Sequence, residues 1–142
     1  MTDFGGCKAA FVNAGRVLCY LRDDFPGLPF AGHWDLPGGG REGDETPEDC
    51  LLRELFEEFG LRFGAERLVW TREFRWFHKP EVRVWFFGGL ITEAEIAAVR
   101  FGDEGQYWEM MPVDAFMAHE KAVPDLQKRL GIFLAEGPLL TP

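Results

Sequence analysis

The sequence predicts an α/β domain in which helices sandwich a mixed β-sheet. Strand-like and helical segments follow one another in the order strands, helix, strands, helices, which is typical of this class. Of the 142 residues, 46% are hydrophobic and 15% are aromatic, which is enough to bury a substantial core. No repeat, low-complexity tract or linker divides the chain, so we expect residues 1–142 to form a single domain.

The first part of the chain favours short strands separated by turns. Residues 8–13 and 16–22 are apolar, strand-forming runs, and the Ala-Gly step between them predicts a hairpin. Residues 23–33 contain two prolines and two glycines and are expected to form a loop. A short strand is expected at 34–36, where Pro37 and three glycines end it.

The strongest helical pattern runs from Pro47 to Phe59. Thr46 is a suitable N-cap, Asp49 follows it at the spacing of a capping box, and proline is tolerated in the first turn. Gly60 is expected to end the helix as a C-terminal cap. One face is apolar and is expected to pack on the core; it comprises Leu51, Leu52, Leu55, Phe56 and Phe59.

The second half of the chain also combines strands with helices. Strands at 68–77 and 81–91, with a turn at 78–80, predict a long hairpin. The remaining expected elements are a helix at 92–99 opened by a threonine cap, a strand at 105–111, and helices at 112–118 and 125–135.

The overall charge and composition exclude several functional classes. The chain has 15 basic and 24 acidic residues, a formal net charge of -9, which argues against a basic surface that binds nucleic acid. No apolar run reaches the roughly 18–20 residues that span a bilayer, so no membrane association is expected. Three cysteines without a CxxC pair indicate neither a disulfide framework nor a cysteine zinc site. Because the first residues also lack a signal-peptide pattern, we expect a cytoplasmic protein.

Much of the excess negative charge lies in one segment. Between positions 38 and 61 there are eight acidic and only two basic residues. A solvated helix face is the ordinary interpretation of such a run. However, Glu54, Glu57 and Glu58 share one helix face at i, i+3 and i+4 spacing, where like charges destabilise a helix, and Arg53 is the only base on this helix. A divalent cation such as Mg²⁺ prefers carboxylate oxygens and bridges to phosphates, so the cluster predicts a metal site for an anionic ligand.

A known family shares this arrangement. Gly38, Gly39 and Gly40 precede the helix and let backbone approach a ligand or place a carbonyl on the metal. Together with the helix they resemble the box of the Nudix hydrolase family, G-x5-E-x7-R-E-U-x-E-E-x-G-U, in which U is a bulky aliphatic residue. The match runs from Gly39 to Leu61 without exception and comprises Gly39, Glu45, Arg53, Glu54, Leu55, Glu57, Glu58, Gly60 and Leu61. The lead-in at 34–39, WDLPGG, also resembles the stretch that often precedes the box.

The resemblance implies a MutT-like fold, an α/β/α sandwich with a mixed sheet and the box as loop-helix-loop. It implies hydrolysis of a nucleoside diphosphate linked to another moiety, with Mg²⁺ or Mn²⁺ as the cofactor. By matching position, the metal ligands would be Glu54, Glu57, Glu58 and the carbonyl of Gly38. Arg53 and Glu45 would orient the glutamates and hold the loop, and Gly39, Glu45 and Gly60 would be structural residues of the box.

Hydrolysis also requires a general base and contacts to the substrate. The family uses a box glutamate or a distant one as the base, and the candidate catalytic residues are Glu57, Glu54, Arg53 and Glu104. Glu104 lies in a glycine-flanked loop before an expected strand, and a simple turn acid is its alternative role. Arg22 is a candidate phosphate contact, with a surface salt bridge as the alternative. Trp76 and Trp108 are candidates for stacking on a base, with core packing as the alternative.

The sequence leaves the substrate open. A nucleoside triphosphate, including an oxidised one, is expected because the chain is short and few residues precede Trp34. ADP-ribose and dinucleotide polyphosphates are alternatives. A non-catalytic nucleotide sensor on the same fold is an alternative of another class, disfavoured by the intact box, and an acidic structural domain is a third. We expect a monomer or a homodimer.

Overall fold

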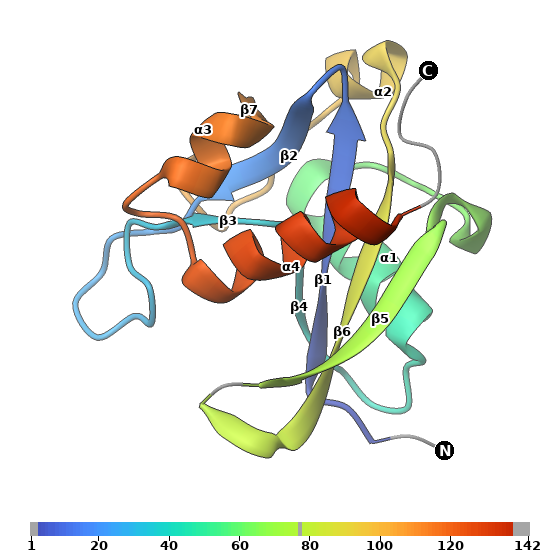
Figure 1. Cartoon of the computed structure of the whole chain (residues 1–142), viewed down its shortest axis with the longest axis vertical. Helices are drawn as coiled ribbons and strands as arrows, with labels where there is room; N and C mark the ends of the chain where they lie inside the picture. The colour runs from blue at the N-terminus through green and yellow to red at the C-terminus, as the bar shows by residue number, and fades with distance from the viewer. Residues whose placement is uncertain (1–2, 77, 138–142) are drawn as a thin grey trace.

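The computed structural model describes residues 3–76 and 78–137 (Figure 1). In chain order its elements are β1 (Gly6–Asn13), β2 (Arg16–Leu21), β3 (Trp34–Asp35), β4 (Gly38–Gly40), α1 (Pro47–Phe59), η1 (Ala65–Arg67), β5 (Trp70–Trp76), β6 (Lys79–Leu90), α2 (Glu93–Ala97), β7 (Tyr107–Pro112), α3 (Val113–Ala118) and α4 (Pro124–Glu136).

Seven strands within the described residues form one mixed sheet. β3, β2, β1, β6 and β5 lie side by side in that order, while β4 also pairs with β1 and β7 also pairs with β2. The central pair, β1 and β6, is parallel, whereas the hairpins β1–β2 and β5–β6 are antiparallel. The parallel pair brings two segments together that are more than seventy residues apart in the sequence, such as Cys7 and Trp85.

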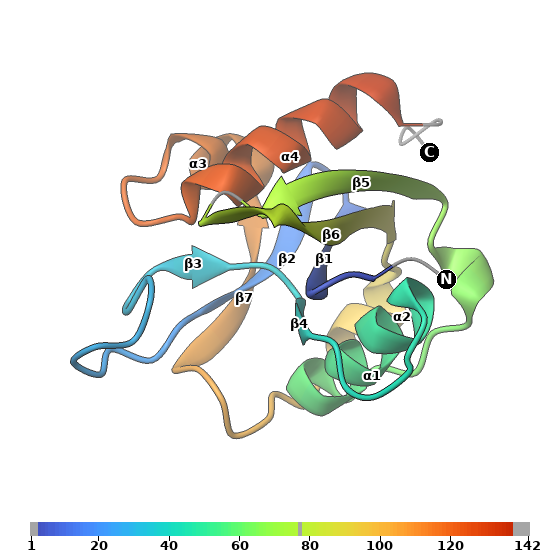
Figure 2. The ribbon, with the colours of Figure 1, turned by 90° about the horizontal axis from the view of Figure 1, so that it is seen from below.

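The helices lie on both faces of this sheet. Figure 2 shows α1 on one side of the strands and α4 on the other. Side chains of β1 alternate between the two faces, so Cys7 and Phe11 join the cluster under α1, and Ala10 and Val12 join the cluster under α4. The predicted α/β/α sandwich with a mixed sheet is confirmed. Within the described residues, no helix is long and apolar enough to cross a bilayer.

The predicted helix 47–59 is confirmed at both ends. The Asp49 amide donates to Thr46 Oγ1 at 3.1 Å, which satisfies one of the free N–H groups of the first turn. Gly60 has φ 69° and its amide donates to the Phe56 carbonyl, which closes the helix in the left-handed conformation that glycine allows. The hairpin of β1 and β2 is likewise confirmed, with Val12 opposite Val17.

Several local predictions differ from the structure. The three glycines form the short strand β4, which pairs with β1, instead of only a turn. A side chain at Gly38 would collide with the Cys7 carbonyl, so this close pairing requires glycine there. Phe56 is 42% exposed and not in the core, and the Arg62 guanidinium lies over its ring, 4.0 Å from the ring centre. β6 begins at Lys79, inside the expected turn, and η1 was not predicted. Position 77, the expected end of the preceding strand, lies outside the described residues.

Candidate active site

Two box glutamates contact the glycine strand β4. The Gly38 amide donates to Glu58 Oε1 at 2.9 Å, and a Cβ at Gly39 would collide with the Glu54 carboxylate. Glycine at position 39 therefore lets the backbone approach a carboxylate of α1 directly. Glu58 is 7% exposed, so this hydrogen bond lies in the interior.

Arg53 braces the loop between β4 and α1. Its guanidinium donates to both carboxylate oxygens of Glu45, at 2.6 and 3.1 Å, and to the Gly40 carbonyl at 2.9 Å. It also donates to Glu57 Oε1 at 3.1 Å, one turn further along α1, and its Nη1 lies 3.7 Å from Glu54 Oε2. The bidentate pair fixes the loop, and the remaining donors orient the neighbouring glutamates.

Two carboxyl groups at this site are held in surroundings that disfavour their ionised form. Burial is the main cause that raises the pKa of Glu58 to about 8; Lys8 and the Gly38 amide oppose it, and the charges of Glu54 and Asp35 add to it. Burial also raises the pKa of Glu54, with Glu57 adding to the effect. A bound cation would favour the ionised form of both groups. The donor set is therefore suited to a hard divalent metal ion.

The carboxylates are not gathered into a closed cage. In the described part of the chain, no three His, Cys, Asp or Glu side chains converge closely enough to hold a metal ion. The Glu57 side chain is 53% exposed and turns toward Arg53. Mg²⁺ commonly keeps several waters and takes only one or two carboxylates with substrate phosphates, so an open set of ligands still fits it.

The loop that carries Glu104 packs on the C-terminal end of α1. The Gly102 amide donates to the Glu58 carbonyl at 2.9 Å, and the Gly105 amide donates to Asp23 Oδ2 at 3.1 Å. Glu104 is exposed between these two anchors, and its charge contributes to the raised pKa of Glu54. The structure thus brings this distant acid to the box.

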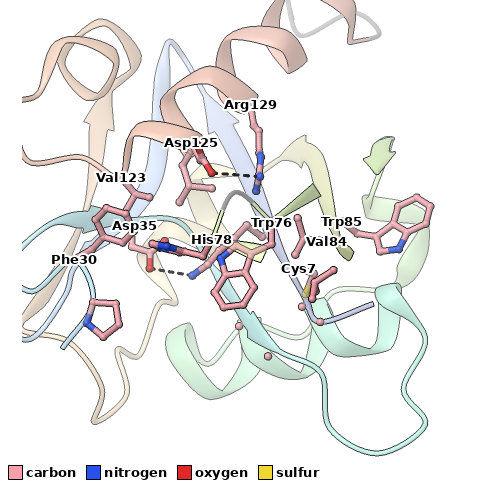
Figure 3. Close-up of a pocket in the computed structure, with 18 of the residues that line it drawn as sticks. Cys7, Phe30, Asp35, Trp76, His78, Val84, Trp85, Val123, Asp125 and Arg129 are labelled. Atoms are coloured by element: carbon pink, nitrogen blue, oxygen red, sulfur yellow. Dashed lines mark hydrogen bonds and ion pairs between the residues drawn. The ribbon is translucent and has the colours of Figure 1, made fainter. Parts of the chain in front are cut away.

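A cavity of about 400 Å³ opens between the sheet and α4 (Figure 3). Gly39 and Gly40 of the box line it, as do Arg22 and Trp76 among the predicted substrate contacts. Its volume lies in the range of small-molecule sites. Trp76 is 42% exposed, so its ring is available to a ligand. Trp108 is not among the lining residues within the described chain and packs instead on the cluster under α1.

A buried charge cluster forms part of the wall, and sequence reasoning missed it. Asp35 is 2% exposed and accepts from Lys8 Nζ at 3.0 Å, Arg22 Nη1 at 2.8 Å and Tyr20 Oη at 3.1 Å. Although burial opposes ionisation, Lys8 and then Arg22 hold the pKa of Asp35 below its usual value. Arg22 therefore lies at the cavity as expected but is held by a buried carboxylate.

Lys8 also connects this cluster to the box. Its ammonium group donates to the Leu36 carbonyl at 3.1 Å and to the Gly38 carbonyl at 3.3 Å. The predicted metal-ligand carbonyl of Gly38 thus already accepts one hydrogen bond, and a carbonyl retains a second lone pair. A lone lysine within an apolar strand, and an aspartate between Trp34 and Leu36, were the available sequence signals.

Comparison with known proteins agrees with this geometry. Residues 9–130 match the NUDIX domain family. The nucleoside triphosphatase NudI of Enterobacter sp. (strain 638) is 37% identical over 87 residues, 61% of this chain and 57% of that protein. An RNA pyrophosphohydrolase of Tolumonas auensis is 34% identical over 111 residues, 66% of this chain and 63% of that protein. The chain thus spans less than two thirds of the length of either relative.

Solved structures show the same fold. The MutT protein of Methanosarcina mazei Go1 superposes with a TM-score of 0.73 at 22% identity, covering 97% of this chain and 98% of that one. A bifunctional NMN adenylyltransferase/ADP ribose pyrophosphatase of Francisella tularensis, complexed with AMP and a Mn ion, gives 0.67 at 22% identity, covering 95% of this chain and 42% of that one. With the family match over most of its length and the intact box on α1, the chain belongs to the NUDIX family of hydrolases.

Proposed function

We propose that the protein is a metal-dependent pyrophosphohydrolase that cleaves a nucleoside diphosphate linked to another moiety. The observation that carries this proposal is the position of β4. Gly39 lines the cavity, and the same residue lies directly against the Glu54 carboxylate of the box. A nucleotide in the cavity would therefore present its phosphates to the box glutamates.

The residues that would hold Mg²⁺, or Mn²⁺ in its place, are Glu54, Glu57, Glu58 and the Gly38 carbonyl. When bound, the cation supplies Lewis acidity toward phosphoryl oxygen and water. The raised pKa values of Glu54 and Glu58 support their assignment, because buried carboxylates of this kind gain most from a neighbouring cation. The manganese in the Francisella structure supports the choice of metal class.

The chain's own groups orient the reaction. Arg53 fixes Glu57 through a hydrogen bond at 3.1 Å and fixes the loop through Glu45. Glu57 and Glu104 are the candidates that accept a proton from the attacking water, since both are exposed beside Glu54. Attack on phosphorus then expels the rest of the substrate.

Nucleoside triphosphates, including oxidised ones, are the favoured substrates, supported by the nucleoside triphosphatase relative. ADP-ribose and dinucleotide polyphosphates are the alternatives, and the ADP ribose pyrophosphatase among the similar structures favours the first of these. A nucleotide sensor is the alternative of another class. The complete set of box glutamates disfavours it, because a sensor has no need of them.

The decisive experiment is a substrate panel with Mg²⁺ that contains nucleoside triphosphates, 8-oxo-dGTP, ADP-ribose, a dinucleotide polyphosphate and a 5′-triphosphorylated RNA. Release of both pyrophosphate and phosphate is measured, with Glu57→Gln as the control. We expect at least one nucleotide to be cleaved much faster by the wild type. Equal rates for wild type and control on every compound would refute the proposed function.

The general base is tested separately by comparing kcat for Glu57→Gln and Glu104→Gln. Loss of a general base lowers kcat by roughly 10²- to 10⁴-fold. Wild-type turnover in both variants, with intact folding, would contradict the proposed scheme.

A further inference from the structure

Two charged side chains of α4 line the cavity, and the box motif does not account for them. Asp125 and Arg129 are one helical turn apart and lie on the same side of the pocket (Figure 3). Gly39 and Gly40 of the box line the same cavity. If the phosphates occupy the box, the remainder of a nucleotide must meet the other parts of this wall. This inference rests on the proposed function.

Arg129 has unused hydrogen-bond donors. Its side chain is 11% exposed, and burial lowers its pKa. Nη2 donates to the Arg75 carbonyl at 3.2 Å and lies 3.6 Å from Asp125 Oδ2, while the guanidinium stands 4.9 Å from the centre of the Phe74 ring. Within the described residues, Nε and Nη1 have no hydrogen-bond partner. A guanidinium offers five N–H donors, so most of those of Arg129, a residue that lines the cavity, have no acceptor within the described chain.

The Asp125 carboxylate also has unused capacity to accept hydrogen bonds. The 3.6 Å separation between Asp125 and Arg129 is too long for a hydrogen bond, so the two charges are neighbours without satisfying each other. The Asp125 side chain is 23% exposed. An isolated structural ion pair would gain by closing this distance. The open geometry instead presents a row of donors beside a carboxylate that can accept two hydrogen bonds.

We propose that Asp125 and Arg129 recognise the edge of a guanine base. Guanine places the O6 acceptor next to two donors, N1–H and N2–H, which matches the donor of Arg129 next to the two acceptor oxygens of Asp125. Adenine offers a donor where guanine has O6 and an acceptor where guanine has N1–H, so both contacts would be reversed. The 8-oxo form of guanine keeps O6, N1–H and N2–H and would be accepted as well.

Aromatic side chains complete the subsite. Trp76, Phe30 and His78 line the cavity, with the Trp76 and His78 rings 5.4 Å apart and the Phe30 and His78 rings 6.2 Å apart. Trp76 supplies an exposed face on which a base can stack, and stacking is tolerant of base identity. The aromatic group therefore contributes affinity, and the pair on α4 contributes selectivity.

The test separates binding from hydrolysis. Dissociation constants for GDP, IDP and ADP are measured by calorimetry in the presence of EDTA, and kcat/KM for GTP, ITP and ATP is measured with Mg²⁺. Inosine lacks only the N2 amino group, so it reports on one of the two contacts to Asp125. We expect the order guanine, inosine, adenine, with about a tenfold step for each lost contact, and the difference in catalysis to lie mainly in KM.

Two variants and one matched control test whether Asp125 and Arg129 cause the preference for guanine. Asp125→Asn and Arg129→Gln should reduce the preference for guanine over adenine to nearly one. Arg72→Gln breaks another ion pair between β5 and α4, that of Arg72 with Glu136 at 2.8 Å, outside the cavity, and should leave the preference intact. If the ion pair between Asp125 and Arg129 had only a structural role, both substitutions would change the affinity for all nucleotides equally.

Each outcome is decisive. Equal dissociation constants for GDP and ADP in the wild type, or an unchanged preference in both α4 variants, would overturn this inference. A guanine preference in binding without hydrolysis of any nucleotide would support the inference and refute the proposed catalytic function instead.

Discussion

Replacing Asp35 by asparagine perturbs the buried charge cluster at the cavity wall. The carboxylate accepts four hydrogen bonds, including one from the Leu36 amide at 2.7 Å, and two of its donors are the cations Lys8 and Arg22. Because those cations hold its pKa below the usual range, it is ionised at neutral pH. Asparagine can still accept from Leu36, but its amide group would face the two cations.

The loss of stability caused by Asp35→Asn comes from the two cations that lose their buried partner. Breaking a buried ion pair by removing one member destabilises a protein by about 3–5 kcal/mol. Lys8 and Arg22 are 22% and 24% exposed, so water can partly solvate the cations, and we expect the lower end, about 3 kcal/mol. Lys8 also holds the Gly38 carbonyl, so activity should fall as well.

The assay is urea unfolding at pH 7, compared with the control Glu136→Gln. Glu136 pairs with Arg72 at 2.8 Å, but both side chains are about half exposed, so its loss should cost less than about 1 kcal/mol. If Asp35→Asn cost no more than this control, the cluster would not be the compensated buried charge network described above.

Three further predictions concern the box, an ion pair and the metal. Gly39→Ala should displace the Glu54 carboxylate and lower kcat at least tenfold with little loss of stability. Gly40→Ala is the control and should be nearly neutral, because its added methyl would meet only the Gly5 carbonyl at 3.9 Å. Equal kcat values for the two variants would contradict the role of β4. The hydrogen bond to Arg67 lowers the pKa of Glu95 to about 2. The stabilisation by Glu95 should therefore be complete above about pH 5 and disappear toward pH 2. The difference in unfolding free energy between the wild type and Glu95→Gln measures this, and a difference that stayed constant over this pH range would contradict the prediction. Mg²⁺ at one hundred times its Kd should stabilise the wild type by about 2.7 kcal/mol, measured as a higher Tm. Chelation should remove both the increase in Tm and the hydrolysis. An unchanged Tm on addition of Mg²⁺ would contradict a metal site.

Features encoded by neighbouring residues were predicted well. The helix 47–59 was correct at both ends, because Thr46, Pro47 and Gly60 act through hydrogen bonds and dihedral angles within one turn. The pairing of Arg53 with Glu57 also follows from i, i+4 spacing alone. The prediction that Phe56 packs in the core was wrong. The helical period places Phe56 on the apolar face, but only part of that face is buried in the folded protein.

The substrate side of the site depends on contacts between distant segments. Arg22 and Trp76 were predicted and do line the cavity, but Trp108 points to the other face of the sheet, because side chains alternate along β7 and the register with β2 decides which ones face α4. That register cannot be obtained from the residues of β7 alone.

The chain itself therefore encodes the family, the box helix and its acidic face, because these depend on spacings of a few residues along one backbone. The tertiary structure alone decided that Lys8, Asp35 and Arg129 surround one cavity beside Gly39. Those residues come together through the pairing of β1 with β4, the pairing of β2 with β1 and β3, and the packing of α4 on the sheet. Because their partners are far apart in sequence, no local pattern carries that information.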